Sequence, residues 1–454
     1  MQATGFLSCP GMSVKDRSLF SLSWPLVVTI ALGIFQPMLD SWFLGRVSDE
    51  AAAGVGSLGA LIMTMFMVLQ ALAQAGASIA SQFLGAGRKS HARATQTLVM
   101  TGSVAMGVVM TLLIWPIKDL LVRMLGLEGV VAVHAGDFLG IFVLGMVFKA
   151  LQVTLTSLIA SHGRTKWNLG ANALSLVINA ILNYVFLEGM FGLPRMGVKG
   201  VACATVISWV AVDILLWIIL RKDSGTHRHL TSLRRGISLV LPDWMRIGLP
   251  AAVEPVSYSV YQVVVTALIV RLGTLSMTAR VYAGNFAMLA VIFSVGIGIG
   301  NQILVAHLVG AFEYRKANQR LRQSLVWGCG LAFGVAILVA VGGNFLLAIY
   351  TQNSEVIKLA GMCLWADAVL QPAKAANIVI TNALRASGDS KFPAIVGTSM
   401  MWTLGLGGVV ALGYGLHMGL LGIWLGMAFD EWTRAILNYR RWTSGAWKNK
   451  GVVH

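Results

Sequence analysis

Twelve long apolar segments constrain this chain more than any other feature of its sequence. Each is about twenty residues or longer, the length that an α-helix needs to cross the hydrocarbon of a bilayer. Lipid offers no partner to an unpaired backbone N–H or C=O group, so we expect helices and no isolated strands. The sequence therefore predicts an all-α membrane protein with twelve transmembrane helices near residues 19–43, 55–84, 94–115, 134–158, 168–187, 200–220, 246–270, 282–310, 324–349, 356–384, 393–414 and 418–438.

Composition and charge agree with a membrane protein. The chain is 57% hydrophobic and only 11% charged, whereas soluble domains carry about 25% charged residues. In a soluble protein the net charge of +16 would suggest nucleic acid. Here the basic residues lie in short loops and are enriched on the side of the N-terminus, so they orient the chain in the membrane. We expect no nucleic-acid partner, and a multi-pass protein of the bacterial inner (plasma) membrane with both termini in the cytoplasm.

The sequence gives no sign of an enzyme. It has no G-x-x-x-x-G-K-[ST] loop for ATP, and its histidines have no metal-ligand spacing outside one His-x-His in a loop. We expect no cofactor apart from a coupling ion, H⁺ or Na⁺. Na⁺ is the one metal ion for which the sequence offers ligands, at Asp40 or at Glu254.

The two halves of the chain repeat each other at an offset of 225 residues. That offset places Pro25 on Pro250, Arg46 on Arg271, Gly59 on Gly284, Gly85 on Gly310, Lys149 on Lys374, Gly163 on Gly388 and Lys166 on Lys391. Each half has six spans, an even number, so both halves enter the membrane from the same side as parallel repeats. We expect a cytoplasmic N-terminal segment (1–18), an N-lobe (19–220), a cytoplasmic linker (221–241), a C-lobe (242–439) and a basic cytoplasmic tail (440–454).

The first span carries a carboxylate, Asp40. An ionised Asp in hydrocarbon costs about 2.5–3.5 kcal/mol on insertion scales, so it needs a partner, a proton or water. At 1.5 Å per helical residue, Asn179 and Asn183 on the fifth span and Thr205 on the sixth fall at the depth of Asp40. These four residues are candidates for a coupling-ion site in the N-lobe. Alternatively, the amides and the hydroxyl only link helices by hydrogen bonds.

Pro25 is a candidate bending point of the same span. Proline removes a helix hydrogen bond and clashes with the preceding turn. Pro25 has a counterpart in the second half, Pro250, so it can also serve the shared scaffold. Asp40 has none, because Val265 stands at the equivalent position.

The second half has its own acidic residues, Glu254 and Asp367, both expected near mid-membrane. They are candidates for a C-lobe acidic site that binds a cation or a cationic substrate, unless Asp367 pairs with Lys374. Lys149 and Lys374 are equivalent under the repeat. They either extend to the cytoplasmic interface or are candidate cavity cations that neutralise the carboxylates.

Several motifs together resemble the multidrug and toxic compound extrusion (MATE) family, over essentially the whole chain. They are Pro25 with Asp40, Asn179-x-x-x-Asn183, Ile247-Gly248-Leu249-Pro250-x-x-x-Glu254, Gln82-Phe83-Leu84-Gly85-Ala86-Gly87 and Arg385-Ala386-Ser387-Gly388-Asp389-Ser390-Lys391.

The resemblance implies two pseudo-symmetric six-helix bundles and a monomeric antiporter in contact with membrane lipid. It would export small organic cations or amphiphiles by alternating access. It also implies that Asp40 is the N-lobe cation residue, that Pro25 bends the first helix, and that Glu254 and Asp367 match acidic positions of one branch. Many members carry Asp where this chain has Asn183, which favours H⁺ over Na⁺ here.

Two other transporter classes remain open at this stage. A lipid-linked oligosaccharide flippase of the same superfamily more often has fourteen spans and a cationic cavity. A major facilitator transporter shares twelve spans and parallel halves, but usually has an Asp in the loop that here reads Gly85-Ala86-Gly87-Arg88-Lys89. The sequence names no substrate.

Overall fold

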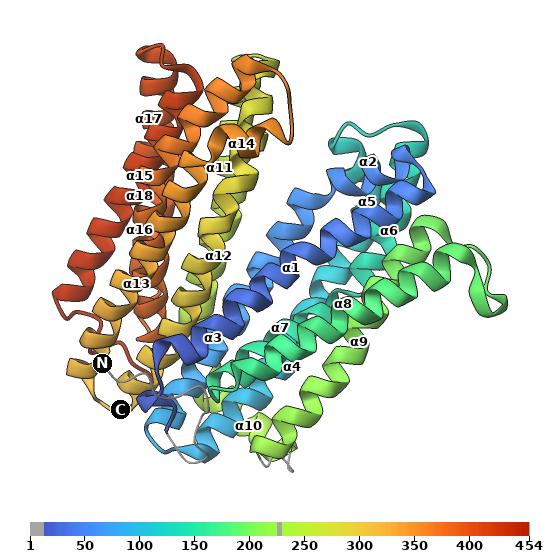
Figure 1. Ribbon diagram of the computed structural model, residues 1–454. Coiled ribbons are helices and arrows are strands. Elements are labelled where there is room, and N and C mark those ends of the chain that lie inside the picture. The colour runs from blue at the N-terminus through green and yellow to red at the C-terminus, as the bar shows by residue number, and fades with distance from the viewer. Residues whose placement is uncertain (1–12, 225–228, 454) are drawn as a thin grey trace. The chain divides into compact units, whose positions relative to one another are not determined.

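The computed structural model describes residues 13–224 and 229–453. The described residues form helices and no strand. The α-helices are α1 (Leu19–Val47), α2 (Asp49–Ser57), α3 (Gly59–Gly85), α4 (Lys89–Ile114), α5 (Lys118–Met124), α6 (Gly129–Leu144), α7 (Met146–Ser161), α8 (Thr165–Glu188), α9 (Gly197–Ser224), α10 (His229–Leu239), α11 (Leu241–Arg271), α12 (Thr274–Gly310), α13 (Tyr314–Val341), α14 (Gly343–Ala348), α15 (Ser354–Ala386), α16 (Lys391–Met400), α17 (Leu406–Val410) and α18 (Gly419–Thr443) (Figure 1). Short 3-10 turns are η1 (Val14–Asp16), η2 (Trp115–Ile117) and η3 (Met190–Gly192), and π-helical segments are η4 (Met401–Gly405) and η5 (Ala411–Gly415).

The membrane spans agree with the prediction in type and order. Ten stretches within the described residues are long and apolar enough to cross a bilayer, the last being the continuous run from α16 to η5. An eleventh is the pair α6 and α7, which is bent by 52° at Gly145, where a Cβ would meet the side chain of Val206 at 2.3 Å. The twelfth predicted span is α18, whose apolar character is interrupted by buried charges. The expected all-α membrane fold is confirmed for the described residues.

The chain forms two compact units. Of the described residues, unit 1 contains 13–27, 81–88 and 249–453, and unit 2 contains 28–80, 89–224 and 229–248. Three helices therefore change unit along their length: α1 after Val27, α3 after Ala80 and α11 after Gly248. The predicted lobes, 19–220 and 242–439, differ from these units at those helices. Residues 1–12 of the predicted N-terminal segment, 225–228 of the predicted linker and 454 lie outside the described part of the chain.

The repeated glycines mark a close helix crossing inside unit 1. A Cβ on Gly85 would lie 2.1 Å from the carbonyl oxygen of His307, and a Cβ on Gly310 would lie 1.9 Å from the carbonyl oxygen of Gln82. Gly85 and Gly310 are 225 residues apart, as are Gln82 and His307, so repeat-related positions of α3 and α12 meet each other. The repeat therefore conserves a contact between backbones that only glycine permits.

Helix α10, which precedes α11, and the described part of the C-terminal tail both pack against other helices. Helix α10 packs on α4, because a Cβ on Gly236 would lie 2.8 Å from the carbonyl oxygen of Ala94. In the tail, Trp447 is fully buried and stacks on Trp442 with ring centroids 4.1 Å apart. The Val452 N–H donates to Gln82 Oε1 at 2.8 Å. The tail up to Val452 is thus a packed part of unit 1.

Candidate functional site

Four polar side chains meet inside unit 2. Asn183 Nδ2 donates to Asp40 Oδ1 at 2.9 Å, and Thr205 Oγ1 donates to Asp40 Oδ2 at 3.2 Å. Asn183 Nδ2 also donates to Asn179 Oδ1 at 3.2 Å, and Asn179 Nδ2 donates to Thr205 Oγ1 at 3.2 Å. All four side chains are buried, and Asp40 is 9% exposed. The structure brings together the residues that the depth argument grouped, and their role as an ion site stays a prediction.

Local helix geometry explains this arrangement. Asn179 and Asn183 are four residues apart on α8 and therefore share one face. Thr205 sits on α9, which packs against α8, and Asp40 comes from α1. The amide of Asn183 turns its N–H groups toward Asp40, so that Asn183 Oδ1 is left buried without a hydrogen-bond partner among the described residues. Asp40 is therefore surrounded by donors, which suit an ionised carboxylate.

Pro25 lies in the same helix, fifteen positions before Asp40, in the part of α1 that belongs to unit 1. Its ring nitrogen has no hydrogen to donate to the carbonyl of Ser21, so the ladder of α1 lacks one bond there. The change of unit follows after Val27. Its role in bending stays a prediction.

Lys149 points into an aromatic environment in unit 2. Its Nζ donates to Gln152 Oε1 at 2.9 Å and lies 4.8 Å from the ring centroid of Phe66 and 5.0 Å from that of Trp209. Asp213 on α9 interacts with it electrostatically, and both carboxylate oxygens of Asp213 lack a hydrogen-bond partner in the described part of the chain. Our sequence reasoning overlooked Asp213, although a carboxylate within the sixth span was a signal for it.

The two acids predicted for one C-lobe site occupy different environments in unit 1. Glu254 forms an ion pair of 2.5 Å with Arg385 and lies against Gly397 of α16, where a Cβ would be 2.8 Å from Glu254 Oε1. Asp367 instead accepts from Gln371 Nε2 at 3.1 and 3.0 Å and from Trp424 Nε1 at 3.3 Å. Asp367 lines a cavity of about 400 Å³ whose lining does not include Glu254.

Lys374 lines the same cavity. No ion pair within 4 Å joins it to Asp367 among the described residues, although the two charges interact electrostatically. The alternative of an Asp367–Lys374 pair stays a prediction. Arg280 also lines this cavity, although the predicted spans 246–270 and 282–310 leave it in the loop between them. The correction follows from the start of α12, which begins at Thr274 and not near residue 282. The Arg280 guanidinium lies 5.2 Å from the Trp424 ring centroid. It donates to Gln262 Oε1 at 3.3 Å.

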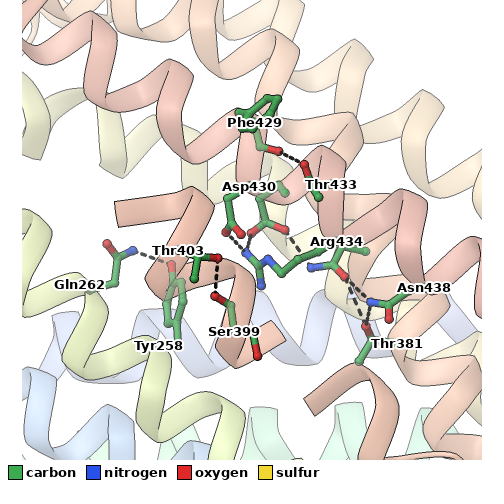
Figure 2. Close-up of polar contacts among 12 residues, drawn as sticks. Tyr258, Gln262, Thr381, Ser399, Thr403, Phe429, Asp430, Thr433, Arg434 and Asn438 are labelled. Carbon is green, nitrogen blue, oxygen red and sulfur yellow. Dashed lines mark hydrogen bonds and ion pairs between the residues drawn. The ribbon is translucent and has the colours of Figure 1, made fainter. Parts of the chain in front are cut away.

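A buried charge cluster on α18 was not anticipated from the sequence. Arg434 pairs with Asp430 at 2.7 Å and with Glu431 at 2.9 Å. Glu431 also accepts from Asn377 Nδ2 at 2.9 Å, and Figure 2 shows Asp430 and Arg434 beside the neighbouring polar residues of unit 1. The sequence pattern that could have revealed it is Asp430 and Glu431 followed by Arg434. Spacings of three and four residues place opposite charges on one helix face.

Comparisons with known proteins agree on one family. The MatE family model matches residues 25–185 and 250–409. The chain is 31% identical over 440 residues to the uncharacterized transporter YisQ of Bacillus subtilis, covering 97% of this chain and 96% of YisQ. It is 25% identical over 450 residues to the probable multidrug resistance protein NorM of Thermotoga maritima, covering 96% and 94% of the two chains.

Solved structures show the same fold. A crystal structure of MATE in the bent conformation superimposes with a TM-score of 0.86, at 17% identity, covering 96% of this chain and 97% of that one. The family model spans most of the chain and both halves of its repeat, and the helices have the same arrangement. The chain therefore belongs to the multidrug and toxic compound extrusion (MATE) family.

Proposed function

We propose that this protein exports small amphiphilic or cationic molecules in exchange for protons, with Asp40 as the residue that carries the proton. The observation that carries the proposal is the buried Asp40–Asn179–Asn183–Thr205 cluster in a chain of the MATE family. A carboxylate within a membrane span is functional by default, since it is costly to keep there without a role. The relatives named as multidrug resistance proteins support the substrate class.

The donors around Asp40 favour a proton over Na⁺. Na⁺ needs oxygen ligands, but Asn183 presents an N–H group to Asp40 and Thr205 presents its hydroxyl hydrogen. Binding of Na⁺ would require both groups to turn. A proton needs less rearrangement, because it converts one carboxylate oxygen into a donor and weakens only the bond that this oxygen accepts.

The transport cycle follows from this exchange. In the outward-open state Asp40 takes up a proton from outside and its charge-assisted bonds to Asn183 and Thr205 weaken. The change at Asp40 passes along α1 to Pro25, where the helix lacks a backbone bond, and substrate affinity falls. Substrate leaves outward, and the reset releases the proton to the cytoplasm.

Orientation and assembly complete the proposal. The described N-terminal end meets the α12–α13 connection through a bond between Lys15 and Glu313, and Tyr314 in the same region donates to the Lys448 carbonyl in the tail at 3.5 Å. The first described residues and the described tail therefore lie at the same end of unit 1. Together with the basic loops, this supports cytoplasmic termini in a bacterial plasma membrane. We propose a monomer with small-molecule substrates and no enzymatic activity.

The other two transporter classes, the flippase and the major facilitator transporter, are less well supported. Membership of the MATE family contradicts a major facilitator transporter. A flippase for lipid-linked oligosaccharides would not be expected to couple a soluble organic cation to an ion gradient, so the transport test below distinguishes it.

The test is uptake of tetraphenylphosphonium into proteoliposomes under a pH gradient and, separately, under a Na⁺ gradient. We expect uptake with the pH gradient alone. Uptake that requires Na⁺ would overturn proton coupling, and no response to either gradient would overturn the antiport itself. Asp137→Asn serves as the matched control, because it removes a carboxylate that pairs with Lys199 at the surface of unit 2.

A further inference from the structure

The cavity of about 400 Å³ in unit 1 is lined by an ammonium group to which no described residue offers an acceptor. Lys374 lines this cavity, and no hydrogen bond or ion pair joins its Nζ to a described residue. The nearby carboxylates are already engaged: Asp367 accepts from Gln371 and Trp424, and Glu431 accepts from Arg434 and Asn377. An ammonium with three free donors inside a membrane span is costly unless water or a ligand in the cavity supplies acceptors.

A hydrogen-bonded chain supplies a further donor beside Lys374. Arg280 has only donors, so Gln262 must face it with Oε1, as the bond of 3.3 Å shows. Gln262 then turns Nε2 toward Tyr258 and donates to its phenol oxygen at 2.6 Å (Figure 2). Since this oxygen accepts, the Tyr258 O–H is directed elsewhere, and no described residue accepts from it. Tyr258 lines the cavity and interacts electrostatically with both Lys374 and Arg280.

We propose that Lys374 and Tyr258 bind a carboxylate group of the transported molecule in this cavity. Two donors, one of them charged, face a space with no partner for either. Other unpaired acceptors among the lining residues, Asp430 Oδ1 and Gln371 Oε1, are shielded from the cavity. Trp424 and Met427 provide apolar surface in the same lining. Beside the simple cations used to test transport, the substrates therefore include amphiphiles with a carboxylate, and zwitterions in particular.

This inference rests on the proposed export function and refines its substrate class. The charges of the cavity lining are balanced, with Arg280, Lys374 and Arg434 against Asp367, Asp430 and Glu431. A zwitterion keeps that balance, whereas a simple cation adds an unmatched positive charge near Lys374. Discrimination therefore depends on the carboxylate itself.

The test compares a fluorescent rhodamine that has a free carboxylate with its methyl ester, which differs only in that group. Binding to the purified full-length protein is measured by fluorescence anisotropy in detergent, without any ion gradient. We expect Lys374→Gln to weaken binding of the acid by about tenfold or more, with binding of the ester unchanged or tighter. Tyr258→Phe should weaken only the acid, and Lys374→Arg should restore most of its binding.

The matched control is Lys358→Gln, which removes an exposed lysine from the same helix. We expect it to leave both affinities unchanged. If Lys374→Gln weakens acid and ester equally, or changes neither, the carboxylate site is wrong. Thermal unfolding of each variant shows that the protein is folded. Because binding is measured without transport, its failure is distinct from a failure of proton coupling at Asp40.

Discussion

The Arg434 cluster allows a sharp test of how unit 1 is held together. Arg434→Met removes the one cation that pairs with Asp430 and Glu431 at 2.7 and 2.9 Å. The exposed fractions of the three side chains are 6% for Arg434, 3% for Asp430 and 9% for Glu431. Breaking a buried pair by removing one partner costs about 3–5 kcal/mol, because the remaining charge is left uncompensated. Two carboxylates lose their partner here, so we expect a loss at the upper end of that range.

The assay is the thermal midpoint of the purified protein in detergent, followed by the amount that stays monodisperse. A second variant combines Arg434→Met with Asp430→Asn and Glu431→Gln, which removes all three charges at similar volume. We expect it to recover most of the loss, since no buried charge is left unpaired. Arg440→Gln on the exposed face of α18 is the control and should change stability by less than about 0.5 kcal/mol. A single variant as stable as the control, or a triple variant no better than the single one, would refute this reasoning.

Two further predictions concern the ends of the chain. Trp447→Ala should destabilise unit 1 by about 3–5 kcal/mol, because Trp447 is fully buried and stacked on Trp442; a midpoint near that of the parent protein would mean that the tail is not part of the fold. Hydrogen bonds from Lys15 and then Lys316 lower the pKa of Glu313 from its ordinary value of 4.5. This stabilisation is present above the unfolded pKa and is lost as the pH falls through the lowered folded value. The thermal midpoint of Glu313→Gln should therefore lie slightly below that of the parent at neutral pH. This difference should shrink at a pH well below 4.5. A difference that grows as the pH falls would contradict the prediction.

The sequence predicted the helical membrane fold and the grouping around Asp40 for clear physical reasons. Long apolar runs permit only helices in lipid, and helical rise converts residue number into depth. Asn179 and Asn183 also share a face by their spacing, so depth and direction agreed. The match of Gly85 to Gly310 indicated a repeat, but only the structure shows that these two glycines allow backbones to touch.

Depth in the membrane alone did not predict which side chains meet in the second half of the chain. Glu254 and Asp367 were grouped because both were expected near mid-membrane. Their positions around their helices differ, so that Glu254 forms an ion pair with Arg385 and Asp367 accepts a hydrogen bond from Trp424. Arg280 was assigned to a loop because a charge marks the apparent end of an apolar run. The buried charges of α18 were missed because a charge was read as a sign of exposure. Arg434 is instead paired with two acids on its own helix and is buried.

The most direct test of the central claim is proton movement caused by substrate. Proteoliposomes with a pH-sensitive dye inside receive tetraphenylphosphonium, and the change in internal pH is recorded for the parent protein, Asp40→Asn and the control Asp137→Asn. We predict a substrate-dependent proton flux for the parent and the control, and none for Asp40→Asn, whose neutral side chain cannot take up or release a proton. Proton flux in Asp40→Asn equal to that of the parent would contradict the assignment of Asp40 as the proton carrier.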